Sequence, residues 1–382
     1  MTTASPSAGL AGVIAGQTVL STVGQEGCGL TYRGYAIEDL AEHATFEEVA
    51  WLLLRGDLPT QQTLDEYRQR LKGLRELPSS LKSVLEQLPL TTHPMDVLRT
   101  GCSALGCLEP EEDTSDATKQ FDIADRLLAA FPGMLLYWHR FHSEGTRMET
   151  SSNEGTIAGH ILHLLHGHAP APVHQRVLDV SLILYAEHEF NASTFTARVV
   201  TSTLADFYSA ITAAIGALRG PLHGGANEAA FELINRFTTP DEAERGVMEL
   251  LARKEKVMGF GHRVYRTEDP RSTVIQEWAK RLSREVGDTR LYPVAERIEA
   301  VLRREKKLFP NLDFYSAIAF HHLGLPTQFF TPLFVFSRTS GWAAHILEQR
   351  ADNRLIRPMG EYVGHAPRPY VPIHSRQETS AS

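Results

Sequence analysis

A histidine held between glycines offers hydrogen-bond chemistry near the middle of the chain. The turn Arg219–Gly225 (RGPLHGG) carries His223, and its Gly and Pro residues end the apolar, helix-like run Thr201–Leu218. A new helix with apolar spacing is predicted at Ala226–Phe237. Unpaired N–H groups and the helix dipole at its start disfavour an imidazolium, so we expect a neutral His223 that donates a hydrogen bond. A structural histidine that only caps the turn fits the same pattern.

The loop Lys256–Arg271 (KVMGFGHRVYRTEDPR) is a second candidate for chemistry. It places His262 in a glycine-rich stretch, and the basic residues around it are Lys256, Arg263, Arg266 and Arg271. A basic loop lined by backbone N–H groups suits a nucleotide or another ligand that bears phosphate. The Gly-x-Gly pattern alone is a weak signal, and a solvated basic loop remains the alternative.

Single polar residues in apolar surroundings complete the candidates. Asp313 stands just before an apolar helix (PNLDFYS), where it is either a catalytic carboxylate or an N-cap. Arg338 (FVFSR) and Arg357 (LIRP) lie in apolar segments, and a partly buried arginine needs an anion from the protein or from a substrate. His188 follows an apolar helix (AEHEF), where a hydrogen-bonded core histidine is the usual role.

Two other catalytic chemistries have less support in the sequence. The segment GHILHLLHGH lacks the H-E-x-x-H spacing of a zinc hydrolase, and its histidines are His160, His163, His166 and His168. The segment HGGAN is similar to the oxyanion loop of esterases, but the chain contains no G-x-S-x-G motif. We therefore expect no metal, and a metal-dependent hydrolase built on the histidine run stays a remote alternative.

The elements that must position these residues are helices. Apolar periodicity predicts one helix after another, and β-like pieces only at Val13–Val23 and Leu30–Tyr32. Thr45–Gly56 begins with a capping box of Thr45 and Glu48 and ends at a glycine. The other predicted helices are Leu64–Leu77, Ser79–Leu88, Asp96–Gly106, Ile123–His142, Ile157–His166, Val173–Ala186, Asp241–Lys256, Thr273–Glu285, Val294–Lys307, Asp313–His322 and Pro332–Gln349. Because βαβ alternation and a fixed-period repeat are absent, the expected fold class is all-α.

Two clusters of helix-breaking residues divide the chain. Gly220–Gly225 and Gly324–Pro326 bracket a helical segment of roughly 100 residues, which is a usual size for a small domain. They predict a large domain formed by residues 1–222 and 326–382, and a small domain formed by residues 223–325. A cleft between two such domains is a common place for a ligand and for hinge closure.

Composition narrows the class of function. The 382 residues carry a net charge of −8, which argues against non-specific binding to nucleic acid. An anionic substrate would therefore need a local group of arginines. The sequence shows no apolar run long enough to cross a membrane and neither a signal nor a transit peptide. Together with an odd number of cysteines and no C-x-x-C motif, these features predict a cytoplasmic protein with reduced thiols.

Several segments, in their order and spacing, resemble the citrate synthase family. They are GPLHGGAN, GFGHRVYRTEDPR, PNLDFYS, FVFSRTSGWAAHILEQ and IRP, and the resemblance extends from about Leu10 to Pro372. LYAEHEFNASTFTARV, HPMDVLRTGCSALG and TYRGYAIEDLAEHATFEEVAWLLLRG are most similar to the bacterial 2-methylcitrate synthases of this family. The resemblance implies a homodimer of two-domain helical subunits with a few short N-terminal β pieces. It also implies the condensation of propionyl-CoA with oxaloacetate and water to 2-methylcitrate and CoA. Acetyl-CoA is a second substrate or, in the alternative of a citrate synthase, the main one.

The resemblance further implies a role for each candidate residue. Asp313 would be the base, His223 would donate to the thioester oxygen, and His262 would polarise the carbonyl of oxaloacetate. The implied contacts of oxaloacetate are His188, Arg271, Arg338 and Arg357, the last supplied across the dimer interface. The implied CoA-binding loop is Lys256, Val257, Met258, Gly259 and Phe260, and Phe334 would lie beside the acyl group. No cofactor is implied, since the CoA thioester is a substrate. A non-catalytic helical scaffold would not need this whole set.

Overall fold

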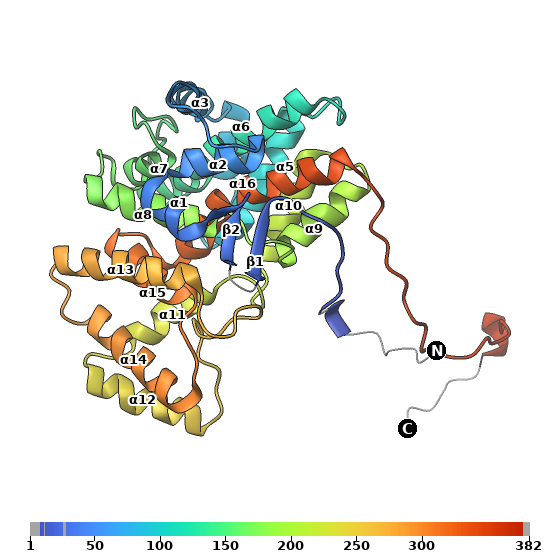
Figure 1. Cartoon of the computed structure of the whole chain (residues 1–382). Helices are drawn as coiled ribbons and strands as arrows, with labels where there is room; N and C mark the ends of the chain where they lie inside the picture. The colour runs from blue at the N-terminus through green and yellow to red at the C-terminus, as the bar shows by residue number, and fades with distance from the viewer. Residues whose placement is uncertain (1–7, 11, 26–27, 377–382) are drawn as a thin grey trace.

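Helices build most of the molecule (Figure 1), as the all-α prediction requires. The computed structural model describes residues 8–10, 12–25 and 28–376. The α-helices are α1 Ile37–His43, α2 Phe46–Arg55, α3 Gln61–Gly73, α4 Ser79–Glu86, α5 Pro94–Leu108, α6 Ala117–Glu144, α7 Ile157–His166, α8 Pro172–Tyr185, α9 Ala192–Ser202, α10 Phe207–Leu218, α11 Ala226–Asn235, α12 Pro240–Ala252, α13 Pro270–Glu285, α14 Leu291–Lys306, α15 Leu312–His322 and α16 Phe330–Ala351. Short 3-10 turns are η1 Ala8–Leu10, η2 Thr327–Phe329 and η3 Ile373–Ser375.

A small antiparallel sheet precedes the helices. Its strands are β1 Ser21–Gln25, β2 Cys28–Tyr32 and β3 Tyr35–Ala36, in the order β1-β2-β3. Thr22 pairs with Thr31, and Thr31 pairs with Ala36 on its other side. The β-like pieces predicted within Val13–Val23 and at Leu30–Tyr32 correspond to β1, which begins only at Ser21, and to β2. Just before β1, the chain is fixed by hydrogen bonds to a side chain of α16. Thr18 Oγ1 and Val19 N donate to the carboxylate of Glu348 at 3.2 and 2.8 Å.

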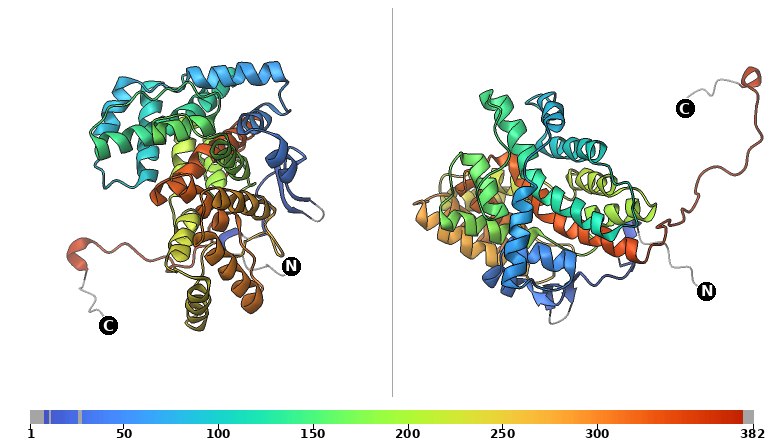
Figure 2. Two further views of the ribbon diagram at one scale, coloured as in Figure 1. Left: turned by 90° about the vertical axis from the view of Figure 1, so that its left-hand side faces the viewer. Right: turned by 90° about the horizontal axis from the view of Figure 1, so that it is seen from above.

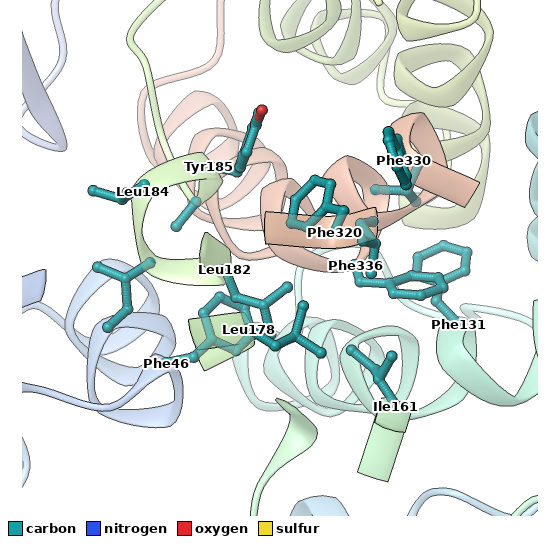
Figure 3. Close-up of a cluster of buried hydrophobic side chains, with 14 of the residues drawn as sticks. Phe46, Phe131, Ile161, Leu178, Leu182, Leu184, Tyr185, Phe320, Phe330 and Phe336 are labelled. Atoms are coloured by element: carbon teal, nitrogen blue, oxygen red, sulfur yellow. The ribbon is translucent and has the colours of Figure 1, made fainter. Parts of the chain in front are cut away.

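The helix α16 lies in the middle of the core. Its residues are buried on nearly all sides from Phe330 to Ile346, and it packs against α2, α6, α8 and α9. A helix that is buried around nearly its whole circumference must be enclosed by others. Figure 3 shows part of this core, in which Phe46 of α2, Phe131 of α6, Leu182 of α8 and Phe336 of α16 belong to one cluster of buried side chains. The C-terminal half of the fold therefore depends on helices from the N-terminal half.

Helices α11 to α15 pack mainly on one another. Helix α12 packs on α14, and α15 packs on both α11 and α13. They gather on one side of the molecule, and α13 and α15 connect them to α8 (Figure 1). After α16 the chain leaves the helices as an extended, exposed segment up to residue 376 (Figure 2). The predicted domains, 1–222 with 326–382 and 223–325, remain a prediction, and residues 1–7 and 377–382 lie outside the described residues.

Local sequence signals locate most helices. The predicted capping box of α2 is confirmed, because Thr45 N donates to Glu48 Oε2 at 2.7 Å. The prediction of one uninterrupted helical run over Thr201–Leu218 is wrong, because α9 ends at Ser202 and α10 begins only at Phe207. Asp206 ends the interruption by capping α10, accepting from Ser209 N at 2.9 Å. Helices α1 and α9 were not predicted.

Candidate active site

One cavity of about 700 Å³ brings together candidate residues from distant parts of the chain. His188 follows α8, His223 follows α10, and His262 precedes α13. Arg271 lies in the first turn of α13, and Asp313 in the first turn of α15. The predicted residues that line this cavity are His188, His223, His262, Arg271, Asp313, Phe334 and Arg338. The arrangement combines imidazoles, a carboxylate and guanidinium groups, which suits proton transfer on an anionic substrate.

His223 is fixed by the start of α9. Its Nε2 atom lies 3.1 Å from Ser193 N and 2.8 Å from Ser193 Oγ. A backbone N–H only donates, so Nε2 accepts and the proton of the neutral ring lies on Nδ1. Burial, assisted by the charge of Arg338, lowers the pKa of His223 to about 4, which agrees with the predicted neutral imidazole. The helix terminus that contacts His223 belongs to α9, whereas the sequence had pointed to α11.

His262 has the opposite tautomer. Its Nδ1 atom accepts from Val264 N at 3.1 Å and from Tyr265 N at 3.2 Å, which leaves the proton on Nε2. Burial and the charge of Arg271 lower the pKa of His262 to about 4. Gly259, three residues before His262 in the loop, has a φ of +86°, and a Cβ there would lie 2.9 Å from the ring of Phe314. Glycine is therefore required for the loop to pass so close to α15.

Asp313 is not the N-cap of its helix. That role belongs to Asn311, whose Oδ1 accepts from Asp313 N at 3.1 Å. The carboxylate of Asp313 instead accepts a hydrogen bond of 2.6 Å from the hydroxyl of Tyr185. Burial raises the pKa of Asp313, while the bond from Tyr185 and the charge of Arg271 oppose that rise. A partly buried carboxylate of raised pKa that faces a cavity is well suited to act as a general base.

Arg271 is paired within its own helix turn. Its Nε and Nη2 atoms donate to the two oxygens of Asp269 at 2.9 and 2.8 Å. Asp269 also accepts from Leu312 N at 3.2 Å, so one carboxylate joins the start of α13 to the start of α15. This arrangement fixes Arg271 relative to Asp313, the neighbour of Leu312 in the chain.

Arg338 and His188 complete the polar side of the cavity. Arg338 Nε donates to the carbonyl oxygen of Tyr185 at 2.7 Å, and its guanidinium carbon lies 4.6 Å from the ring centroid of Phe334. Burial lowers the pKa of Arg338 to about 10, and the carboxylate of Glu187 opposes this. His188 Nε2 lies 3.1 Å from the hydroxyl of Tyr265, and burial with the charge of Arg271 holds its pKa well below the usual range. The cavity therefore offers cations together with neutral hydrogen-bond donors, which suits a carboxylate.

The remaining predicted residues lie outside this cavity. Lys256, Val257, Met258, Gly259 and Phe260 line a second cavity of about 470 Å³, together with Lys254 and Lys306. Asn311 lines both cavities, so the two are adjacent. Arg357 is exposed on the extended segment after α16 and does not line the first cavity. A site within one chain therefore does not include Arg357.

The histidine run has four separate environments. His160 Nδ1 lies 2.9 Å from Ser152 Oγ, and His163 Nδ1 lies 3.1 Å from Glu154 Oε1. His166 and His168 each contact a backbone carbonyl, at 2.9 and 3.0 Å. Among residues 8–10, 12–25 and 28–376, no three His, Cys, Asp or Glu side chains are arranged to hold a metal ion. In the same residues, no helix is both long and apolar enough to cross a membrane.

The comparison with known proteins agrees with this geometry. Residues 9–359 match the family model "Citrate synthase, C-terminal domain". The chain belongs to the citrate synthase family. It is 58% identical over 369 residues to the 2-methylcitrate synthase of Shewanella oneidensis, which covers 97% of this chain and 98% of that protein. Citrate synthase 2 of Bacillus subtilis is 44% identical, and the alignment covers 96% of this chain and 98% of that protein. The chain is thus an enzyme of the citrate synthase and 2-methylcitrate synthase type.

Solved structures of citrate synthases share the fold. The enzyme of Pyrobaculum aerophilum superimposes with a TM-score of 0.86 at 37% identity and covers 96% of this chain and 95% of its own. A ternary complex of the Thermoplasma acidophilum citrate synthase with carboxymethyl coenzyme A and oxaloacetate has a TM-score of 0.88 at 33% identity, covering 96% and 98%. The predicted resemblance to the citrate synthase family is therefore confirmed.

Some residues of the site had no role in the sequence prediction. Asp269 stands directly before a proline at the first position of α13, which is a recognisable N-cap pattern. Tyr185 and Ser193 carry no comparable local signal. Their partners, Asp313 and His223, lie 128 and 30 positions away in the chain, so only the fold reveals them.

Proposed function

We propose that this citrate synthase family member condenses propionyl-CoA with oxaloacetate and water to give 2-methylcitrate and CoA. Acetyl-CoA would be a second substrate and would give citrate. The observation that carries the proposal is the convergence of Asp313, His223 and His262 on one cavity that also holds Arg271 and Arg338. The 58% identity to a 2-methylcitrate synthase supports propionyl-CoA, while the 44% identity to a citrate synthase keeps acetyl-CoA as the alternative main substrate.

Oxaloacetate binds on the cationic side of the cavity. Its carboxylates pair with Arg271 and Arg338, and His188 adds a neutral contact. His262 points its Nε2–H at the ketone oxygen, because its Nδ1 atom is occupied by backbone N–H groups. The hydrogen bond draws electrons from the carbonyl carbon and makes it a better electrophile.

The difficult step is the removal of a weakly acidic proton from the α-carbon of the acyl-CoA. Asp313 takes this proton, and the enolate oxygen that forms accepts a hydrogen bond from Nδ1–H of His223. The α-carbon then forms a bond to the ketone carbon, and the resulting alkoxide takes the Nε2 proton of His262. The proton that Asp313 removed from the α-carbon restores the neutral imidazole of His262 and leaves Asp313 ionised for the next turnover. Water finally hydrolyses the thioester and CoA leaves as a thiol. These steps need only proton transfer and electrostatic stabilisation, so we propose no metal or redox cofactor.

The same proposal assigns the surroundings of the site. Lys256–Phe260 hold CoA beside the reaction cavity, and Phe334 packs on the acyl group. Residues 223–325 form a small domain that closes on the large domain after oxaloacetate binds, which excludes water until the carbon–carbon bond exists. The chain acts in the cytoplasm as a homodimer, and Arg357 of each subunit completes the site of the other.

Thiol release from the two acyl-CoA substrates tests the proposal directly. With oxaloacetate present, we expect turnover of both and a higher kcat/KM for propionyl-CoA. One methylene group in a pocket is worth about 1–3 kcal/mol, so the preference should lie between about tenfold and 200-fold. A preference for acetyl-CoA would assign the alternative function, citrate synthase. No thiol release from either substrate would overturn both, and stoichiometric zinc in that inactive protein would favour a metal-dependent hydrolase.

A further inference from the structure

Tyr185, the last residue of α8, touches the site at three points. Its hydroxyl donates to Asp313 Oδ1 at 2.6 Å and lies 2.8 Å from Ser316 Oγ. Its backbone carbonyl accepts from Arg338 Nε at 2.7 Å, and its ring meets the ring of Phe334 edge-on with 4.8 Å between centroids. Figure 3 shows its hydroxyl directed away from the apolar side chains of the core. One residue thus contacts the carboxylate and an arginine of the same cavity.

The protons of this cluster can be assigned. An ionised carboxylate only accepts, so the single hydroxyl proton of Tyr185 goes to Asp313 Oδ1. Towards Ser316 the tyrosine oxygen can then only accept, and the one proton of Ser316 Oγ is shared between this oxygen, at 2.8 Å, and the carbonyl oxygen of Asp313, at 3.1 Å. Burial and the neighbouring charge of Asp313 hold the pKa of Tyr185 well above its ordinary value, so the hydroxyl keeps its proton. The order of donation is therefore Ser316 to Tyr185 to Asp313.

We propose that Tyr185 is a positioning residue of the condensation, which selects the oxygen of Asp313 that acts as the base. Its hydroxyl occupies Oδ1 and leaves Oδ2 to take the α-proton of the acyl-CoA, while its carbonyl fixes Arg338 beside the same reaction. The inference rests on the proposed function, in which Asp313 is the base.

The hydrogen bond has two consequences for Asp313. It fixes the rotation of the carboxyl group, and a reacting atom that is misplaced by about 1 Å can slow a reaction about a hundredfold. It also stabilises the charged form against the burial that raises the pKa of Asp313. Without it the pKa of Asp313 rises further, and the base is protonated at a higher pH.

The variant Tyr185→Phe tests both consequences, because it keeps the ring and the carbonyl that holds Arg338. We expect kcat to fall about ten- to a hundredfold for propionyl-CoA, since a hydrogen bond to a charged group is lost. The acidic limb of the pH profile of kcat/KM should move to higher pH. The affinity for oxaloacetate, measured by calorimetry, should change less than about twofold.

Two further variants separate this role from a general effect on packing. Tyr137→Phe removes a similar hydrogen bond of 2.6 Å, from a tyrosine to Glu86, at a place that does not line the cavity. It should leave kcat and the acidic limb unchanged. Ser316→Ala removes the donor behind Tyr185 and should shift the limb in the same direction by a smaller amount.

The outcomes are distinguishable. If Tyr185→Phe keeps the native kcat and the native acidic limb of the pH profile of kcat/KM, Tyr185 does not position the base. If it changes only the ratio of propionyl-CoA to acetyl-CoA turnover, it is a wall of the acyl pocket and the inference is also wrong. Near-native turnover by Asp313→Asn would instead overturn the proposed function itself.

Discussion

His223 and His262 carry their protons on different ring nitrogens, and the backbone decides which. Ser193 N faces Nε2 of His223, whereas the N–H groups of Val264 and Tyr265 face Nδ1 of His262. In each ring, one nitrogen accepts a hydrogen bond from the main chain, and the other nitrogen carries the proton and donates. Protonation of either ring would place a proton against an N–H group, in surroundings that already disfavour the charged form. Both rings are therefore suited to donate hydrogen bonds without carrying charge.

This electrostatic arrangement predicts how stability depends on pH. The pKa of His262 is about 4 in the folded chain and near 6.5 in the unfolded one, so the unfolded chain takes up the proton first as the pH falls. Stability present above pH 6.5 is therefore lost between pH 6.5 and 4, by up to about 3 kcal/mol from this residue. Urea unfolding should show a smaller loss over this range for His262→Asn, whose side-chain oxygen still accepts from the two N–H groups.

The exposed histidine His43 provides the control for that measurement. His43→Asn should follow the native curve, because this side chain is 73% exposed. Identical curves for the native chain and His262→Asn would show that His262 does not contribute to the loss of stability in acid.

At the scale of elements, α16 positions the segment between α8 and α9. His345 of α16 lies with Nε2 at 2.9 Å from Glu187 Oε1 and accepts from Arg198 of α9 through Nδ1 at 3.0 Å. Trp342 Nε1 donates to Ser193 Oγ at 3.1 Å, next to the contact of Ser193 with His223. A buried helix thus sets the place of His188, which follows Glu187, and the place of Ser193, which contacts His223.

Loss of the central histidine should therefore affect both stability and substrate binding. His345→Leu leaves Glu187 and Arg198 buried with fewer partners, and we expect a loss of about 3 kcal/mol in the free energy of unfolding. The KM for oxaloacetate should rise severalfold, because the segment that carries His188 loosens. Chemical denaturation and steady-state kinetics measure the two effects.

His168→Leu is the matched control, since His168 is exposed and contacts a neighbouring carbonyl and the ring of His166 but no buried charged group. It should stay within about 0.5 kcal/mol of the native chain. Equal stability of the two variants would contradict the role of α16 described above.

The sequence predicts what depends on neighbours in the chain. The capping box of Thr45 and Glu48, the glycine-flanked histidines and the helix periodicity are local signals, and the structure contains each of them. The break between α9 and α10 was missed because Leu204, with a φ of +65°, is not a residue type that marks such a turn. Tyr185 and Ser193 were missed because their roles depend on contacts formed only by the folded chain. Family resemblance, rather than residue chemistry, linked the distant motifs to one site.

At the scale of the whole molecule, the position of Arg357 matters most. It is exposed on a segment that leaves the helices, while the cavity of its own chain already holds Arg271 and Arg338. If each site takes Arg357 from the other subunit, then each depends on two chains. A test of this arrangement requires a dimer with two different subunits.

Mixed dimers of Asp313→Asn and Arg357→Ala subunits provide that test. In such a dimer one site holds both changes and the other holds neither, so one of the two sites is native. Random mixing of equal amounts should restore about a quarter of native activity, because half of the dimers are mixed. Thiol release should rise after the subunits are exchanged. No rise above the two single variants would show that the site is complete within one chain or that exchange does not occur, and native mass spectrometry separates these two outcomes.

The main-chain donors at Ser193, Val264 and Tyr265 have a consequence for sequence change over evolution. Every residue type except proline supplies an amide hydrogen, so side chains at these positions can be replaced without altering the tautomer of either imidazole. The side chains at these three positions can therefore differ between relatives while both imidazoles keep their protonation. The acid–base character of the site is inherited through the course of the main chain.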